Sequence, residues 1–230
     1  MSLILQIETA TTSCSVALAK DGNVLTFKQI NERNIHAVVI TRFIEEVITS
    51  ANVQYGDLDA IAVSCGPGSY TGLRIGISTA KGLCFALNKP LIAIETLTAM
   101  ASGVSLYNGF VPDEDMLLCP MIDARRMEVF TAIFNSHGDC IQPTSAAIID
   151  GTSFKELLAD NKMVFFGDGA EKCANVLSEN TNAVFLPGFV NSAVHLTQQA
   201  LEKLKNKDFE DVAYFEPFYL KEFIAGKKIN

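Results

Sequence analysis

The chain has 230 residues, 49% of them hydrophobic, and a formal net charge of −8. This length and composition are enough for one large domain or two small ones with buried cores. The acidic balance argues against a protein that grips nucleic acid unaided, because such proteins usually carry a basic patch or a high isoelectric point. The one local basic cluster, Lys227–Lys228, is interpreted as a solvated tail.

The sequence also indicates a cellular compartment. No apolar run approaches the length that a bilayer requires, and residues 1–10 lack the basic segment and cleavage pattern of a signal peptide. The six cysteines are scattered without metal-binding or redox spacing, which is typical of free thiols in a reducing environment. We therefore expect a cytoplasmic protein with no membrane association.

The first half of the chain alternates between strand-like and helix-like patterns. A first apolar run ends in Glu8, and Asp21–Gly22–Asn23 is a hairpin signal between the next two runs. Apolar residues at helical spacing follow, and then strands alternate with helices. The predicted elements are strand, strand, strand, helix, strand, helix and strand, at residues 3–8, 13–19, 24–30, 34–50, 58–64, 71–87 and 91–95.

The second half repeats this order of signals. An apolar strand over residues 117–123 ends in Asp123, which aligns with Glu8, and Val129 then aligns with Val16. The stretch "VFFGDGA" lies where "VSCGPGS" lies in the first half. This order indicates an internal duplication, although any two α/β halves share some likeness.

The duplicated order resembles the α/β actin-like ATPase fold (ASKHA, ribonuclease H-like), in which two related lobes face each other across a nucleotide cleft. We expect an N-terminal lobe at residues 1–105 that carries the partner-binding helices. A smaller, degenerate lobe is expected at residues 106–230.

The stretch "SCGPGSYTGLRIG" at residues 64–76 has the composition of a phosphate-binding loop. Gly66 and Gly68 permit close approach of backbone N–H groups to an anion, and Ser69 or Thr71 could cap the following helix. The stretch contains no Walker GK[ST] motif, and a tight strand-to-helix turn remains the alternative. The candidate residues of a degenerate nucleotide or phosphate cleft are Glu8, Thr11, Gly66, Gly68, Ser69, Thr71 and Asp123.

The two strand-end carboxylates have two possible roles. Glu8 and Asp123 could hold Mg²⁺ through water on opposite sides of a cleft. Alternatively they cap turns, with Glu8 accepting hydrogen bonds from Thr11 or Thr12, and Asp123 pairing with one of the two arginines that follow it.

The helix predicted after the glycine loop has one nearly smooth face. Gly72, Gly76 and Ala80 are spaced four residues apart, so another element can approach this face closely. That element is either a helix of a partner chain or the lobe's own sheet or first helix, and both possibilities stay open.

The histidines and serines form no catalytic pattern that is local in sequence. His36, His137 and His195 are far apart, so the common zinc signatures are absent, and there is no GxSxG motif. We expect no catalytic residue and no metal site in this chain.

Four stretches together resemble the TsaB (YeaZ) family nearly end to end. They are "IETATTSCSVAL", "SCGPGSYTGLRIGISTAKGLCFALNKPLIAIETLTAMA", "MIDARRMEVFTAIF" and "EPFYLKE". The resemblance implies a duplicated actin-like fold that has lost catalysis. It also implies a subunit that activates the related enzyme TsaD, with the ATPase TsaE joining them, in making threonylcarbamoyl-adenosine at adenosine 37 of tRNA. ATP and a divalent metal then belong to the partner subunits.

The resemblance also assigns residues. Thr96 and Met100 stand where TsaD has two metal-binding histidines, and neither side chain replaces imidazole as a ligand. Glu8 departs from the family's usual aspartate, which puts metal or phosphate contact there in doubt. The helices over residues 34–50 and 71–87 would form the interface with TsaD, or pair as a homodimer when the chain is isolated. Its expected contact residues are Ile35, Val39, Gly72, Gly76, Thr79 and Ala80.

On this resemblance tRNA is contacted only indirectly, through basic surfaces of the partners. Two alternatives of other classes are a glycoprotease-type metallopeptidase and a small-molecule kinase or ATPase of the same fold. The missing histidine pair argues against the first. The absence of a lysine at the glycine loop argues against the second.

Overall fold

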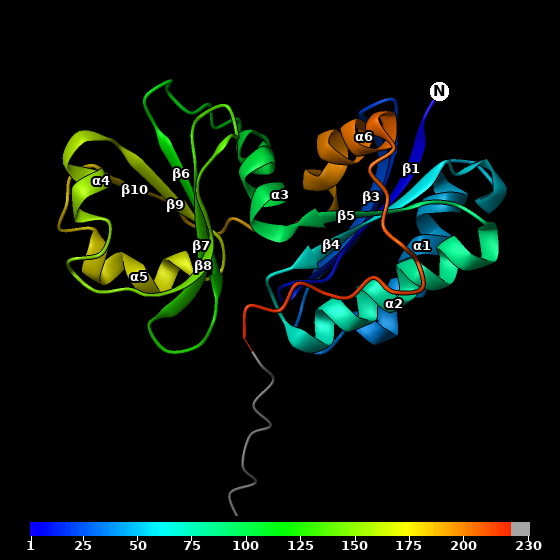
Figure 1. The fold of residues 1–230 in the computed structure, drawn as a ribbon, viewed down its shortest axis with the longest axis horizontal. Helices are drawn as coiled ribbons and strands as arrows, with labels where there is room; N and C mark the ends of the chain where they lie inside the picture. The colour runs from blue at the N-terminus through cyan, green and yellow to red at the C-terminus, as the bar shows by residue number, and fades with distance from the viewer. Residues whose placement is uncertain (222–230) are drawn as a thin grey trace, which may run out of the picture.

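The computed structural model describes residues 1–221, and the predicted basic tail at Lys227–Lys228 lies outside them. Two lobes lie side by side along the long axis of the molecule, each built on one five-stranded mixed sheet (Figure 1). Within the described residues, no helix has the length and apolar character needed to traverse a lipid bilayer.

Lobe I contains the first sheet, in the strand order β3-β2-β1-β4-β5. The first three strands are antiparallel neighbours, and β4 and β5 continue the sheet in parallel. Strands β1, β2 and β4 are buried almost throughout, so apolar residues run along both faces. The strands are β1 (Leu3–Glu8), β2 (Ser13–Lys20), β3 (Asn23–Asn31), β4 (Ala60–Gly66) and β5 (Leu91–Glu95).

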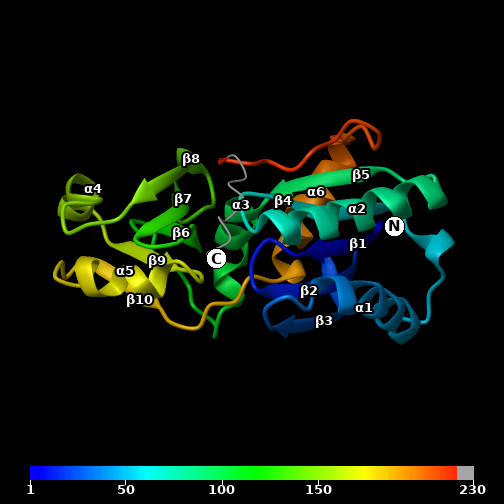
Figure 2. The ribbon, with the colours of Figure 1, turned by 90° about the horizontal axis from the view of Figure 1, so that it is seen from below.

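Helices cover both faces of this sheet. Helices α1 (His36–Ser50) and α2 (Tyr70–Leu87) lie side by side on one face, which Figure 2 shows from below. A short 3₁₀ helix, η1 (Tyr55–Asp57), connects α1 to β4. On the opposite face lie the 3₁₀ helix η3 (Ala193–Leu196) and helix α6 (Thr197–Asn206), which come from the far end of the sequence.

Lobe II repeats the plan of lobe I. Its sheet has the order β10-β9-β6-β7-β8, so each strand occupies the place of its counterpart five strands earlier. This order confirms the internal duplication. The strands and covering helices are β6 (Leu117–Asp123), β7 (Glu128–Phe134), β8 (Cys140–Ile148), α4 (Lys155–Asp160), β9 (Met163–Phe166), α5 (Ala170–Leu177) and β10 (Ala183–Leu186).

Strand register corrects one detail of the sequence alignment. Ser15 lies opposite Glu8, and Val129 lies opposite Asp123. Ser15, rather than Val16, is therefore the structural counterpart of Val129. The turn of lobe I is one residue longer than the turn of lobe II, whereas the alignment assumed a difference of two residues.

Helix α3 (Thr96–Gly103) with η2 (Val104–Leu106) joins the two lobes. Leu97 and Met100 pack into the core of lobe II, whereas Ala99 packs against lobe I. The chain later returns to lobe I: the Thr197 hydroxyl donates to Gln6 and the Ala193 N–H donates to Ser15. Residues 193–206 thus contact the first sheet, although the division predicted at residue 105 assigns them to the second lobe.

The last described residues form a strap, residues 208–221, that crosses α2 and reaches lobe II (orange to red in Figure 1). The N–H of Phe218 donates to the carbonyl of Cys65 at 2.8 Å, at the end of β4. Arg74 on α2 donates to the Tyr219 hydroxyl at 3.1 Å. Lys221 then pairs with Glu128 on β7, so the strap connects the two lobes.

Candidate functional site

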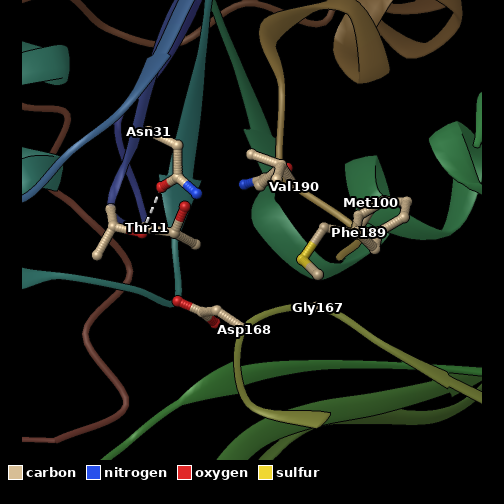
Figure 3. Close-up of a pocket in the computed structure, with 9 residues that line it drawn as sticks. Thr11, Asn31, Met100, Gly167, Asp168, Phe189 and Val190 are labelled. Atoms are coloured by element: carbon tan, nitrogen blue, oxygen red, sulfur yellow. Dashed lines mark hydrogen bonds between the residues drawn. The ribbon is translucent and has the colours of Figure 1, made fainter. Parts of the chain in front are cut away.

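A small cavity of about 30 Å³ lies between the lobes (Figure 3). Ligand pockets for drug-sized molecules measure about 300–1,000 Å³, whereas this volume holds about two water molecules. This pocket by itself is too small for a nucleotide. The lining residues are Thr11, Thr12, Asn31, Met100, Gly167, Asp168, Phe189, Val190 and Asn191.

Glu8, predicted as a metal or phosphate contact, is fully buried at the end of β1. Its Oε1 accepts the Ala10 N–H at 2.5 Å, so it caps its own turn through Ala10 rather than through Thr11 or Thr12. Burial raises the pKa of Glu8 to about 7, against the opposing effect of the hydrogen bond from the Ala10 N–H. Its Oε2 has no partner in the described structure. This carboxyl faces the interior, and it does not line the cavity.

Asp123 holds the equivalent place in lobe II but lies at the surface. Its Oδ1 accepts the Arg125 N–H at 2.9 Å and pairs with Lys172 on α5. Partial burial alone would raise the pKa of Asp123. The hydrogen bonds from Lys172 and Arg125 and the charge of Arg33 outweigh that effect, so the net shift is downward. The ion pair predicted with a following arginine is made with Lys172 instead.

Asp168 is a cavity residue that the sequence patterns did not single out. It lies in the "GDG" loop after β9, where lobe I has "GPG". Its Oδ1 accepts the Asp123 N–H at 3.0 Å, and burial raises its pKa. The correspondence of the two glycine loops was the signal that could have identified it.

The glycine loop after β4 packs against the chain itself. A Cβ on Gly66, whose φ is +121°, would lie less than 3.0 Å from the Phe218 carbonyl oxygen, and one on Gly68 would meet Ala10. Ser69 is the N-cap of α2, because its Oγ accepts the Gly72 N–H at 3.2 Å, and Thr71 is exposed. The loop's glycines are explained by close packing of the strap and of the β1–β2 turn. The alternative of a tight turn accounts for what the structure shows.

The smooth face of α2 is turned toward its own lobe. A Cβ on Gly72 or on Gly76 would come within 3.0 Å of Thr9, and Ala80 is fully buried in the core. Val39 on α1 is buried as well. These four residues lie inside the lobe rather than on a partner-facing surface, because the end of β1 needs the space that the glycines leave.

The outer side of α1 and α2 carries other apolar residues. The predicted contacts Ile35 and Thr79 are partly exposed there. Val38 is 70% exposed and Phe85 is 85% exposed. An open groove beside Phe85 is lined by Lys81, Gly82, Phe85, Asp211, Val212 and Ala213.

The three histidines are separate in space and in role. The Nε2 of His36 lies 3.0 Å from the Thr11 carbonyl oxygen and so donates to it. His195 is buried, and burial lowers its pKa to about 4, while His137 lies in an exposed turn. Residues 1–221 contain no group of three or more His, Cys, Asp or Glu side chains placed to hold a metal ion.

Two sheets of identical strand order, a cavity between them and a glycine loop after the fourth strand of each lobe define the class: a two-lobed α/β protein with the actin-like fold, as predicted. The activator of 2-hydroxyisocaproyl-CoA dehydratase from Clostridium difficile, solved with bound ADPNP, has this fold. It matches 91% of this chain and 98% of its own with a TM-score of 0.52 at 8% sequence identity. That likeness is one of fold alone.

The comparisons in sequence are more specific. The family model described as TsaD, tRNA N6-adenosine threonylcarbamoyltransferase, matches residues 30–225. The Escherichia coli tRNA threonylcarbamoyladenosine biosynthesis protein TsaB is 30% identical over 98% of this chain and 97% of its own length. YeaZ from Pseudomonas aeruginosa matches 96% of this chain and 100% of its own with a TM-score of 0.80 and 25% identity. The chain belongs to the TsaB (YeaZ) family, as its motifs predicted.

Proposed function

We propose that this chain is a non-catalytic subunit that pairs with TsaD and activates it. The reaction is threonylcarbamoyl transfer to adenosine 37 of tRNAs that read codons beginning with A. The names of its relatives place them in threonylcarbamoyladenosine biosynthesis. TsaE is proposed as a further member of the complex, and the isolated chain is proposed to pair with itself through the same surface.

One observation carries the non-catalytic part of the proposal. The start of α3 follows β5, where the TsaD-type metal histidines are expected, and it holds Thr96 and Met100. Both side chains are fully buried, and neither is a substitute for imidazole. A metallopeptidase reaction needs such ligands, so this alternative is not favoured.

The cleft residues do not fit the metal-nucleotide complex that the fold class implies. The cavity of about 30 Å³ is too small. Glu8 is turned into the lobe, and Asp123 already pairs with Lys172. We therefore propose that ATP and the divalent metal act on the partner subunits, and we derive no kinase or ATPase step for this chain.

The pairing surface is proposed to lie on the outer side of α1 and α2. Val38 and Phe85 are large apolar side chains exposed on these two helices, so a partner that covers them would remove apolar surface from water. This assignment keeps the two helices predicted from the sequence but replaces the buried small residues by exposed ones.

The test is co-purification with TsaD followed by a threonylcarbamoyl transfer assay in which each subunit is omitted in turn. Activity should require both chains. Val38→Glu and Phe85→Glu should each weaken pairing about tenfold or more, because each places a charge in an apolar contact. Ile148→Glu is the matched control, since Ile148 is equally exposed on the edge of lobe II.

Two results would contradict the proposal: transfer activity by this chain alone, or full activity of TsaD without it. Unchanged pairing of both charged variants would contradict only the assignment of the surface. Gly76→Leu is not a clean test of that surface, because its side chain would collide with Thr9 inside the lobe.

A further inference from the structure

The turn between β6 and β7 holds two consecutive arginines in the left-handed region of backbone space. The φ angles are +77° for Arg125 and +50° for Arg126. Residues with a Cβ adopt this conformation at an energetic cost, and glycine or asparagine would adopt it more easily. The corresponding turn of lobe I has Ala10 and Thr11, and neither has a positive φ. The lobe II turn is one residue shorter between its paired strand residues, and arginine rather than glycine or asparagine occupies both left-handed positions.

Hydrogen bonds hold this turn in place. The Arg125 N–H donates to Asp123 Oδ1, and the Glu128 N–H donates to the Arg125 carbonyl at 3.1 Å. The Ala124 N–H donates back to the Glu128 carbonyl at 3.1 Å. A turn tied at both ends presents its side chains in a fixed direction, which lowers the entropic cost of binding a ligand.

Two arginines on this turn and a third in lobe I make no side-chain hydrogen bond or ion pair within residues 1–221. Arg125 and Arg126 are exposed, and no side-chain hydrogen bond or ion pair is made by either within residues 1–221. Arg33, in the loop between β3 and α1 of lobe I, is likewise exposed and unpaired among these residues. Its charge contributes to the lowered pKa of Asp123, the residue that precedes the turn.

The neighbouring carboxylates do not neutralise these arginines. Asp123 is paired with Lys172, and Glu128 is paired with Lys221. Asp168 accepts the Asp123 N–H, and no ion pair within residues 1–221 joins it to an arginine. Glu32, next to Arg33 in the chain, reduces the local positive charge but does not cancel it. The turn therefore carries two arginines that pair with no carboxylate among residues 1–221, in a chain whose net charge is −8.

We propose that Arg125 and Arg126, together with Arg33 of lobe I, bind the phosphate backbone of tRNA. The guanidinium group binds phosphate oxygens in bidentate fashion. Such contacts orient the RNA without reading its sequence. This inference rests on the proposed function, and it replaces the expectation that the chain touches tRNA only through its partners.

The experiment measures tRNA binding by the complex of the full chain with TsaD over a range of KCl concentrations. Arg125→Gln/Arg126→Gln should weaken binding about tenfold. It should also reduce the slope of log K against log[KCl] by about 1 for each phosphate that the variant no longer binds. The KM for tRNA should rise with kcat unchanged. Arg33→Gln should have a smaller effect in the same direction.

Three further variants separate this role from folding. Lys205→Gln/Lys207→Gln is the matched control, since both lysines are exposed on lobe I and Lys207 also has a positive φ, +55°. It should change nothing. Arg125→Gly/Arg126→Gly relieves the backbone, so its melting temperature should be no lower than that of the wild type while tRNA binding falls as in the glutamine variant. Arg125→Lys/Arg126→Lys keeps the charge and should retain most of the salt slope.

Unchanged tRNA affinity and salt slope in the glutamine variant, with pairing intact, would overturn the proposal. Loss of pairing with TsaD would also overturn it, because the arginines would then contact a protein. If the wild-type chain neither pairs with TsaD nor activates it, the proposed function fails instead. The salt dependence of tRNA binding by the isolated chain, wild type against the glutamine variant, then decides the role of the arginines.

Discussion

Lobe I and lobe II share one strand order, yet the same position has opposite electrostatics in each. Glu8 and Asp123 both end the first strand, and both accept the N–H of the residue two further on. Glu8 is fully buried, and its pKa rises to about 7. Asp123 lies at the surface, and its pKa falls. The duplication preserved the turn geometry but not the chemistry.

The difference comes from what covers each sheet end. In lobe I the returning chain lies over it: the Ser192 hydroxyl donates to Gln29 at 2.6 Å, and the Ala193 N–H donates to Ser15 at 2.8 Å. This segment removes water from around Glu8. At the end of β6, Asp123 instead meets the ammonium group of Lys172. The carboxyl group that ends β1 is therefore part of the interior, whereas the carboxyl group that ends β6 is part of a charged surface.

Both lobes retain a tight contact between the glycine loop and the first hairpin. Gly68 approaches Ala10 in lobe I, and Gly169 approaches Ile122 in lobe II, so that a Cβ at either place would lie closer than 3.0 Å to a neighbour. This backbone contact, which shapes the fold, is therefore present in both lobes.

The largest expected effect concerns packing in lobe I. Gly72→Ala places a Cβ against the Thr9 carbonyl oxygen, a backbone atom that cannot move away alone. We expect the free energy of unfolding to fall by about 3 kcal/mol. Gly82→Ala is the control on the same helix, because nothing lies within 4 Å of its Cβ. It should gain about 1 kcal/mol from helix propensity. Denaturant unfolding of both variants measures this, and equal stabilities would refute the packing argument.

Next in size is the pH dependence that Glu8 confers. Its pKa is about 7 in the folded chain against an ordinary value of 4.5, so between these limits the native state holds a proton that the unfolded chain releases. The stability that this proton confers is present below pH 4.5 and lost as pH rises through 7. As the pH rises from 4.5 to about one unit above the pKa of Glu8 in the folded chain, the wild type should lose about 3 kcal/mol of unfolding free energy relative to Glu8→Gln. Parallel pH profiles of the two proteins would show that Glu8 is ionised in the fold.

The smallest effect should come from the counterpart in lobe II. Asp123 has a lowered pKa, so its contribution to stability is present above the ordinary pKa of 3.8 and lost as pH falls through the folded value. Because the side chain is partly exposed, Asp123→Asn should cost less than about 1 kcal/mol at neutral pH. The same unfolding series tests this, and a cost larger than that of the pH effect at Glu8 would reverse the comparison between the lobes.

Residue patterns alone were sufficient for the order of strands and helices over residues 3–95, the duplication and the family. Apolar periodicity and turn residues are local signals, and the strand ends at Glu8 and Asp123 are where the structure has them. The family motifs are spread along most of the chain, so the family is recognised even where the alignment contains small errors.

Tertiary structure alone decided what each buried or small residue faces. A row of Gly72, Gly76 and Ala80 has the same pattern whether it meets a partner or the lobe's own β1, and only the fold shows that it meets β1. In the same way, two carboxylates at matching strand ends cannot be told apart until the covering segment, residues 191–197, is placed over one of them. Burial depends on contacts between residues far apart in sequence, and the pKa follows from that burial.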